Sequence, residues 1–165
     1  MPNVPEEEPL SDDRPTLGAL GEFGFIAQVT RGRVQPASTL LGPGDDAAVV
    51  AAPDGRVVAT TDVLVEGVHF RLDWSTPEQI GRKAAAANLA DIAAMGAIPT
   101  ALLVGLAAPA DTPIATLSGL ADGLWAEAGA AGAGLVGGDV VAAAELVIAV
   151  TALGSLEGRA PVTRA

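Results

Sequence analysis

The sequence has no cysteine, no tyrosine and one histidine, and aromatic residues make up only 3% of its 165 residues. Without cysteine the chain can form no disulfide bond and no thiolate metal site. No apolar run reaches the roughly 20 residues that a membrane-spanning helix needs, and the first residues lack the basic and apolar regions of a signal peptide. We therefore expect a cytoplasmic protein that does not act at a membrane.

Positive charge is also scarce, because the sequence has 9 Lys and Arg residues and 20 Asp and Glu residues, which gives a formal net charge of −11 at pH 7. A general nucleic-acid binder needs a basic face, so this class of function is excluded. The acidic balance leaves room for a protein that recruits cations. Nucleophilic catalysis by a Ser/His/Asp or Cys/His set is not supported either, since cysteine is absent and histidine occurs once.

Two parts of the chain differ in composition. Residues 1–15, MPNVPEEEPLSDDRP, are acidic and proline-rich, and we expect a disordered tail there. Residues 16–165 are long enough for one domain with a core of small apolar residues, chiefly Ala, Val, Leu and Gly.

Hydrophobic spacing predicts alternating strands and helices in this domain. TLGALGEFGFIAQVT predicts a short amphipathic helix, and AAVVAAP and RVVATTDVL predict two strands joined by the turn signal PDG. The clearest helix begins at a capping box, with Thr76 as N-cap, Pro77 first and Gln79 third. A second helix begins at a Thr112 cap.

Strands are predicted in ALLVGLAAP, in AGLVGGDVV, with a tight glycine turn, and in ELVIAVTALGSL. The order predicts an α+β, or mixed α/β, layer fold in which helices cover one face of a sheet.

Four aspartates occupy unusually apolar surroundings. Asp46, Asp62 and Asp139 each adjoin an apolar segment, and Asp91 lies in the helix AAAANLADIAAMG, with Asn88 one turn earlier. Buried Asp is rare unless it is paired or bound to metal, and few Lys or Arg lie near these stretches. If the four converge, a hard divalent cation such as Mg²⁺ is the simplest partner, since it takes oxygen ligands and is shared with phosphates.

Each of these residues also has an ordinary structural explanation. GDD and GGD are common turn sequences, Asp62 could cap the turn after its strand, and Asp91 could face solvent. Glycines before the acids, Gly42 and Gly44 or Gly137 and Gly138, would let backbone approach a phosphate, although single glycines usually mark turns. The sequence contains neither a P-loop nor a G-x-G-x-x-G motif opening a helix after a strand.

Several motifs in order resemble one family. GPGDDAAVV, TTDVLVEGVHF, RKAAAANLADIAAMGAIP, LVGGD and GRAPVTR have the order and spacing found in the thiamine-monophosphate kinase family, within the superfamily of ATP-binding proteins related to aminoimidazole ribonucleotide synthetase. The resemblance runs from about Leu17 to the end of the chain. It implies ATP-dependent phosphorylation of thiamine monophosphate to thiamine diphosphate by direct in-line transfer, with ATP as co-substrate and Mg²⁺ as cofactor.

The resemblance also implies roles for individual residues. His69 would contact the substrate, Gly138, Asp139 and Arg164 would contact ATP, and Asp45 would orient its neighbour or reach metal through water. The implied Mg²⁺ ligands are Asp46, Thr60, Thr61, Asp62, Asp91 and Asp139.

Members of this family continue into a second domain, so the chain is similar to an isolated N-terminal half that we expect to be inactive alone. In the superfamily the sheets of two such halves pair into a barrel, which implies a homodimer with the nucleotide near the interface. Two alternatives stay open: another ATP-using enzyme of the superfamily, of the hydrogenase-maturation or purine-synthesis type, and a non-catalytic dimerisation module.

Overall fold

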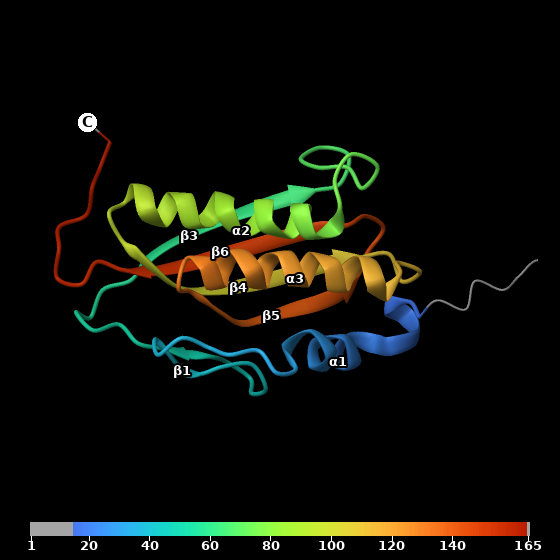
Figure 1. Cartoon of the computed structure of the whole chain (residues 1–165), viewed down its shortest axis with the longest axis horizontal. Coiled ribbons are helices and arrows are strands. Elements are labelled where there is room, and N and C mark those ends of the chain that lie inside the picture. The colour runs from blue at the N-terminus through green and yellow to red at the C-terminus, as the bar shows by residue number, and fades with distance from the viewer. Residues whose placement is uncertain (1–14, 165) are drawn as a thin grey trace, which may run out of the picture.

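The computed structural model describes residues 15–164, so residues 1–14 of the predicted disordered tail lie outside the described part. Helices and strands alternate as the spacing predicts, and the mixed α+β fold is confirmed (Figure 1). In chain order the elements are α1 (Leu17–Thr30), β1 (Thr39–Leu41), β2 (Val49–Val50), β3 (Val58–Val65), α2 (Pro77–Ala94), β4 (Ile98–Ala108), α3 (Ile114–Ala130), β5 (Gly134–Ala142) and β6 (Val147–Ser155).

The main sheet has the strand order β3-β6-β4-β5. The last strand, β6, lies between β3 and β4 and is antiparallel to both. Strands β4 and β5 are parallel, so the chain must cross over between them, and α3 makes this crossover. Strands β3 and β5 therefore form the two edges of the sheet.

One face of the sheet is covered by helices and the other is open. Helices α2 and α3 lie side by side over the covered face (Figure 1), where Ile148, Val150 and Ala152 of β6 are fully buried. Successive strand residues point to opposite faces, so Val63 and Leu103 lie on the open face, and they are 49% and 36% exposed. Helix α1 packs beside β5 and α3 rather than over the sheet.

The start of α2 and its packing against α3 follow from local sequence. The capping box is confirmed, because Thr76 Oγ1 accepts from the Gln79 N–H and Gln79 Oε1 accepts from the Thr76 N–H. Glycines allow the two helices to approach closely: a Cβ at Gly81 would lie 2.0 Å from the Leu120 carbonyl oxygen, and one at Gly123 would lie 2.0 Å from that of Glu78.

The PDG turn lies between two strands as predicted, although these strands do not pair with each other, because β2 pairs with β1 and β3 pairs with β6. Two other local predictions were wrong. Thr112 is not the cap of α3; its carbonyl accepts the Leu17 N–H, and Pro113 takes the N-cap position without a side-chain hydrogen bond. Gly137 and Gly138 form no turn; they continue β5, next to a register shift opposite β4.

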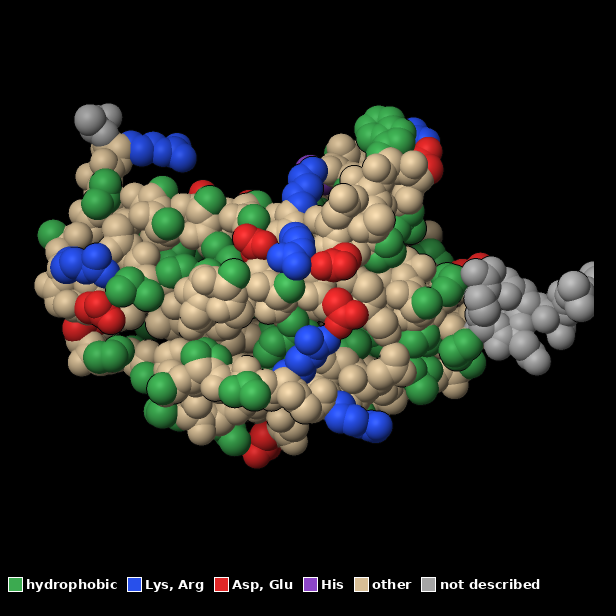
Figure 2. Space-filling model, in the orientation of Figure 1, with side chains coloured by type: hydrophobic (Ala, Val, Ile, Leu, Met, Phe, Trp, Pro, Cys, Tyr) green, Lys and Arg blue, Asp and Glu red, His purple; other side chains and the backbone are tan. Residues whose placement is uncertain are grey.

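Within residues 15–164, no helix has both the length and the apolar character needed to cross a membrane. The outer surface of α2 and α3 carries acidic and basic side chains next to one another (Figure 2). Arg82 of α2 lies 3.1 Å from Glu78 of the same helix and 3.5 Å from Glu127 of α3, so one guanidinium links the two helices.

Candidate functional site

Three of the predicted ligands lie together where β3 passes under the end of α2. We call Thr60, Asp62 and Asp91 the β3–α2 cluster. Thr60 and Asp62 are two residues apart on β3, so both point to the helix-covered face, where each is half-buried. Thr60 Oγ1 donates to Asp91 Oδ2 at 3.2 Å, so strand and helix bring these two side chains into contact.

Thr61 lies on the same strand but its hydroxyl points to the open face. Thr61 Oγ1 donates to the Val150 carbonyl at 3.0 Å and accepts from Thr151 Oγ1 at 3.1 Å. The hydroxyls of Thr60 and Thr61 therefore lie on opposite faces of the sheet, and the two cannot coordinate one ion together.

The other predicted ligands lie at the far edge of the sheet. We call Asp45, Asp46, Gly138 and Asp139 the β5 cluster. All four line one cavity of about 820 Å³, to which the loop between β1 and β2 contributes the paired acids. The Asp46 N–H donates to Asp45 Oδ1 at 2.9 Å, so Asp45 orients the backbone of its neighbour.

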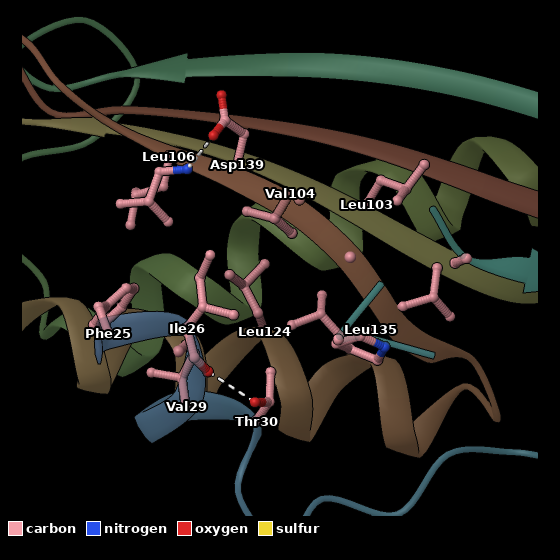
Figure 3. Close-up of a pocket in the computed structure, with 18 of the residues that line it drawn as sticks. Phe25, Ile26, Val29, Thr30, Leu103, Val104, Leu106, Leu124, Leu135 and Asp139 are labelled. Carbon is pink, nitrogen blue, oxygen red and sulfur yellow. Dashed lines mark hydrogen bonds between the residues drawn. The ribbon is translucent and has the colours of Figure 1, made fainter. Parts of the chain in front are cut away.

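The cavity of the β5 cluster has an apolar wall and an acidic rim. Phe25, Ile26 and Val29 of α1 and Leu124 of α3 form much of the wall (Figure 3). Asp139 accepts the Val140 N–H at 2.9 Å, and its carboxylate points away from these apolar side chains. Such a cavity offers a flat apolar group room on one side and presents oxygen ligands at its edge.

Within one copy the two clusters are far apart. Asp62, Val150, Val104 and Gly138 form one row across the sheet. Three strand spacings separate its ends, roughly 14 Å at about 4.8 Å each. Asp139, the neighbour of Gly138, points to the open face. The expectation that the acids converge is therefore not met inside a single chain, and among residues 15–164 no three His, Cys, Asp or Glu side chains are close enough to hold a metal ion.

Neither cluster is neutralised by basic residues. Among the ion pairs between described residues, none includes Asp46, Asp62, Asp91 or Asp139. Carboxylate and hydroxyl oxygens without a cationic partner suit Mg²⁺, which is commonly held by one or two carboxylates, with waters and substrate phosphates completing its shell. The donor sets therefore fit Mg²⁺ as partial sites that a phosphate ligand would complete.

His69 lies in the turn after β3, beyond the β3–α2 cluster. Its Nδ1 accepts the Val65 N–H at 3.0 Å, and its carbonyl accepts a hydrogen bond from Lys83 Nζ. Lys83 and Asp91 are eight residues apart on α2, roughly 12 Å along the helix. His69 is exposed, and because Nδ1 accepts a hydrogen bond, Nε2 is the nitrogen that can donate one.

Arg164 is exposed on the segment that leaves β6. Two residues before it, the Val162 N–H donates to the Met95 carbonyl at 3.0 Å, and the Met95 N–H donates to the Asp91 carbonyl at 3.1 Å. These bonds tie the segment to the same helix end that carries Asp91. Arg164 therefore follows, by two residues, a point of the chain that is bonded to the end of α2.

Two polar residues play parts that the sequence did not reveal. Asn88 lies one turn before Asp91 but is fully buried, with Nδ2 donating to the Ala84 carbonyl at 3.1 Å, so it belongs to the core. Asp54 was interpreted only as part of a turn, yet it accepts hydrogen bonds from Arg56 and from the Gly158 N–H. The Arg two residues after Asp54 was the one available signal.

The relatives found by comparison with known proteins agree with one another in name. Residues 44–156 match the family model "AIR synthase related protein, N-terminal domain". The chain is 59% identical over 159 residues to the thiamine-monophosphate kinase of Mycobacterium tuberculosis, covering 96% of this chain and 48% of that protein. It is 40% identical over 140 residues to the Bacillus subtilis enzyme of that name, covering 84% and 43%. The chain thus spans about half the length of these curated relatives.

Solved structures agree with this assignment. Thiamine-monophosphate kinase from Stenotrophomonas maltophilia superposes with a TM-score of 0.64 at 35% identity, covering 78% of this chain and 39% of that one. A structure described as AaThiL complexed with AMPPCP and TMP has a TM-score of 0.59 at 29% identity, covering 82% and 42%. The family match extends over most of the described residues, and both acidic clusters lie inside it; the chain belongs to the AIR synthase related protein family, as an N-terminal domain of that family.

Proposed function

We propose that this chain is the ATP- and metal-binding half of a thiamine-monophosphate kinase. The observation that carries the proposal is the 59% identity to the Mycobacterium tuberculosis relative across 96% of this chain. The AaThiL structure supports the substrate pair, because it holds TMP and AMPPCP, an analogue of ATP. The two clusters of carboxylates without basic partners support a role in binding a polyphosphate through cations.

The cavity beside β5 is the proposed place for the nucleotide. Its apolar wall suits the base, and the β5 cluster at its edge suits the phosphates. Gly138 and Asp139 would contact the nucleotide, and Arg164 would add a fork of donors to phosphate oxygens. The proposed Mg²⁺ ligands remain Asp46, Thr60, Thr61, Asp62, Asp91 and Asp139, with Thr61 contributing through its backbone.

A second copy of the chain would bring the two clusters together. The open face of the sheet is apolar, with Val63, Leu103 and Val141 between 36% and 49% exposed, so it has reason to be covered. If two sheets pair by this face about a two-fold axis parallel to the strands, β3 of one copy lies opposite β5 of the other. Because β3 is an edge strand, its β3–α2 cluster would then lie at the rim of the interface, across the edge of β3 from the partner's β5 cluster. We propose that the two clusters share one nucleotide at this rim, so that the homodimer holds two sites.

The proposed reaction is an in-line phosphoryl transfer. A terminal phosphate oxygen of thiamine monophosphate attacks the γ-phosphorus of ATP, a new P–O–P bond forms, and the bond to the β,γ-bridging oxygen breaks to release ADP. Bound Mg²⁺ supplies charge neutralisation between the two anions. His69 would hold the substrate phosphate through Nε2–H, and no general base is required because the attacking phosphate is already ionised.

Two experiments test this proposal. Calorimetric titration of the chain with ATP should show binding that requires Mg²⁺, and its absence would favour a non-catalytic dimerisation module. A chimera in which the chain replaces the matching half of the Mycobacterium tuberculosis relative should convert thiamine monophosphate to the diphosphate. A chimera that folds and hydrolyses ATP but leaves thiamine monophosphate unchanged would favour another ATP-using enzyme of the superfamily.

A further inference from the structure

Asp54 joins two turns that are far apart in the sequence. It lies in the turn before β3 with its side chain 16% exposed. Its Oδ1 accepts the Arg56 N–H at 3.1 Å, and its Oδ2 accepts the Gly158 N–H at 2.9 Å and Arg56 Nη2 at 2.6 Å. Arg56 Nη2 also donates to the Arg159 carbonyl at 3.1 Å. We call Asp54 and Arg56, with their bonds to Gly158 and Arg159, the exit latch.

The segment that leaves β6 is bonded to the rest of the domain at two anchor points, and the exit latch is the first of them. Gly158 adopts φ 82° and Glu157 adopts φ 50°, so the chain turns sharply at the position where Asp54 accepts the Gly158 N–H. The second anchor is the bond from the Val162 N–H to the Met95 carbonyl. Between these points the segment is otherwise exposed, so its path depends on the two anchors.

The second anchor leads to the β3–α2 cluster. Met95 is one helical turn after Asp91 and donates its N–H to the Asp91 carbonyl. Arg164 is two residues beyond Val162, about 7 Å of extended chain at most. A shift of the segment at Gly158 would therefore move the guanidinium relative to the acids of this cluster.

We propose that Asp54 is a positioning residue, which fixes the exit segment so that Arg164 reaches a phosphate bound at the β3–α2 cluster. This inference rests on the proposed function, because it takes Arg164 to contact that phosphate. The Gly158 N–H, followed by Arg56, lowers the pKa of Asp54 from its ordinary value of 3.8 to about 2, because both hydrogen bonds favour the charged carboxylate.

The test is a double-mutant cycle on MgATP binding by the chain. Asp54→Asn keeps the shape of the side chain but removes its charge and one acceptor, and it should weaken MgATP binding about tenfold. In an Arg164→Ala background, the same change should have no further effect. Asp73→Asn is the matched control, because Asp73 also pairs with an Arg two residues away but lies in the exposed turn after β3, and it should leave affinity unchanged. Amide hydrogen exchange at Gly158 and Val162 should be faster in Asp54→Asn than in the wild-type chain, and Asp73→Asn should leave it unchanged.

The possible outcomes separate the positioning role of Asp54 from the proposed function. Equal weakening by Asp54→Asn in both backgrounds, or no weakening at all while Arg164→Ala weakens binding, overturns the positioning role and leaves the proposed function intact. Unchanged hydrogen exchange at both amides also overturns it. A folded wild-type chain that binds no MgATP overturns the proposed function itself, together with any role of the latch in binding.

Discussion

The contact between α2 and α3 allows a prediction that can be worked from the structure. In Gly123→Ala, the new Cβ would lie 2.0 Å from the Glu78 carbonyl oxygen and 2.8 Å from the Arg82 nitrogen. Both are backbone atoms, so no side chain can rotate out of the way, and the helices must separate by about 1 Å or more. Forced separation of packed elements costs about 1–3 kcal/mol or more, while replacing Gly by Ala inside a helix recovers about 1 kcal/mol.

Because the clash is with backbone, we take the upper end of this cost, about 3 kcal/mol, and subtract the recovered 1 kcal/mol or so. Gly123→Ala should then lower the free energy of unfolding by about 2 kcal/mol, which corresponds to a drop in Tm of about 4–8 °C for a domain of this size. Gly129→Ala is the matched control on the same helix, because its Cβ would meet nothing within 4 Å, and it should leave stability unchanged or raise it slightly. Urea denaturation followed by circular dichroism measures the free energy of unfolding of both variants. A Gly123→Ala chain as stable as the Gly129→Ala chain would refute the close packing.

Three further changes test the site, the interface and the acid response. Asp91→Asn should abolish Mg²⁺-dependent ATP binding by titration, whereas Asp111→Asn, in the exposed turn before α3, should bind as the wild type does; equal binding by both would remove Asp91 from the ligands. Val63→Lys, on the open face, should convert dimer to monomer in sedimentation, whereas Val68→Lys, in the exposed turn after β3, should not; a dimer that persists in Val63→Lys would contradict pairing through this face. Because folding lowers the pKa of Asp54 from 3.8 to about 2, its stabilising charge is present above pH about 4 and is lost as pH falls toward 2, so Asp54→Asn should flatten the loss of stability in this range, and an unchanged acid profile would contradict the latch.

Local signals predicted local structure well. The capping box at Thr76 and Gln79 depends on residues within one helical turn, and it is confirmed. The failures at Thr112 and at Gly137 and Gly138 came from contacts across the chain. Thr112 is engaged by Leu17, and the two glycines are held in β5 by pairing with β4.

The separation of the two clusters could not be predicted from the sequence. The spacing of Asp62 and Asp139 shows only that each adjoins a strand. Their distance depends on β6, the last strand, which inserts between β3 and β4 and leaves β3 and β5 at opposite edges. The same long-range placement brings Gly158 to Asp54, which no local pattern records.

Mixing two inactive variants tests the central claim most directly, namely that each binding site takes one acidic cluster from each of two copies. Asp62→Ala and Asp139→Ala chains should each fail to bind MgATP alone. After unfolding and joint refolding, half of the dimers are mixed, and in each of these one site carries both changes while the other carries none. The account predicts that about a quarter of the wild-type binding capacity returns. A mixture that binds no more than the separate variants would contradict it.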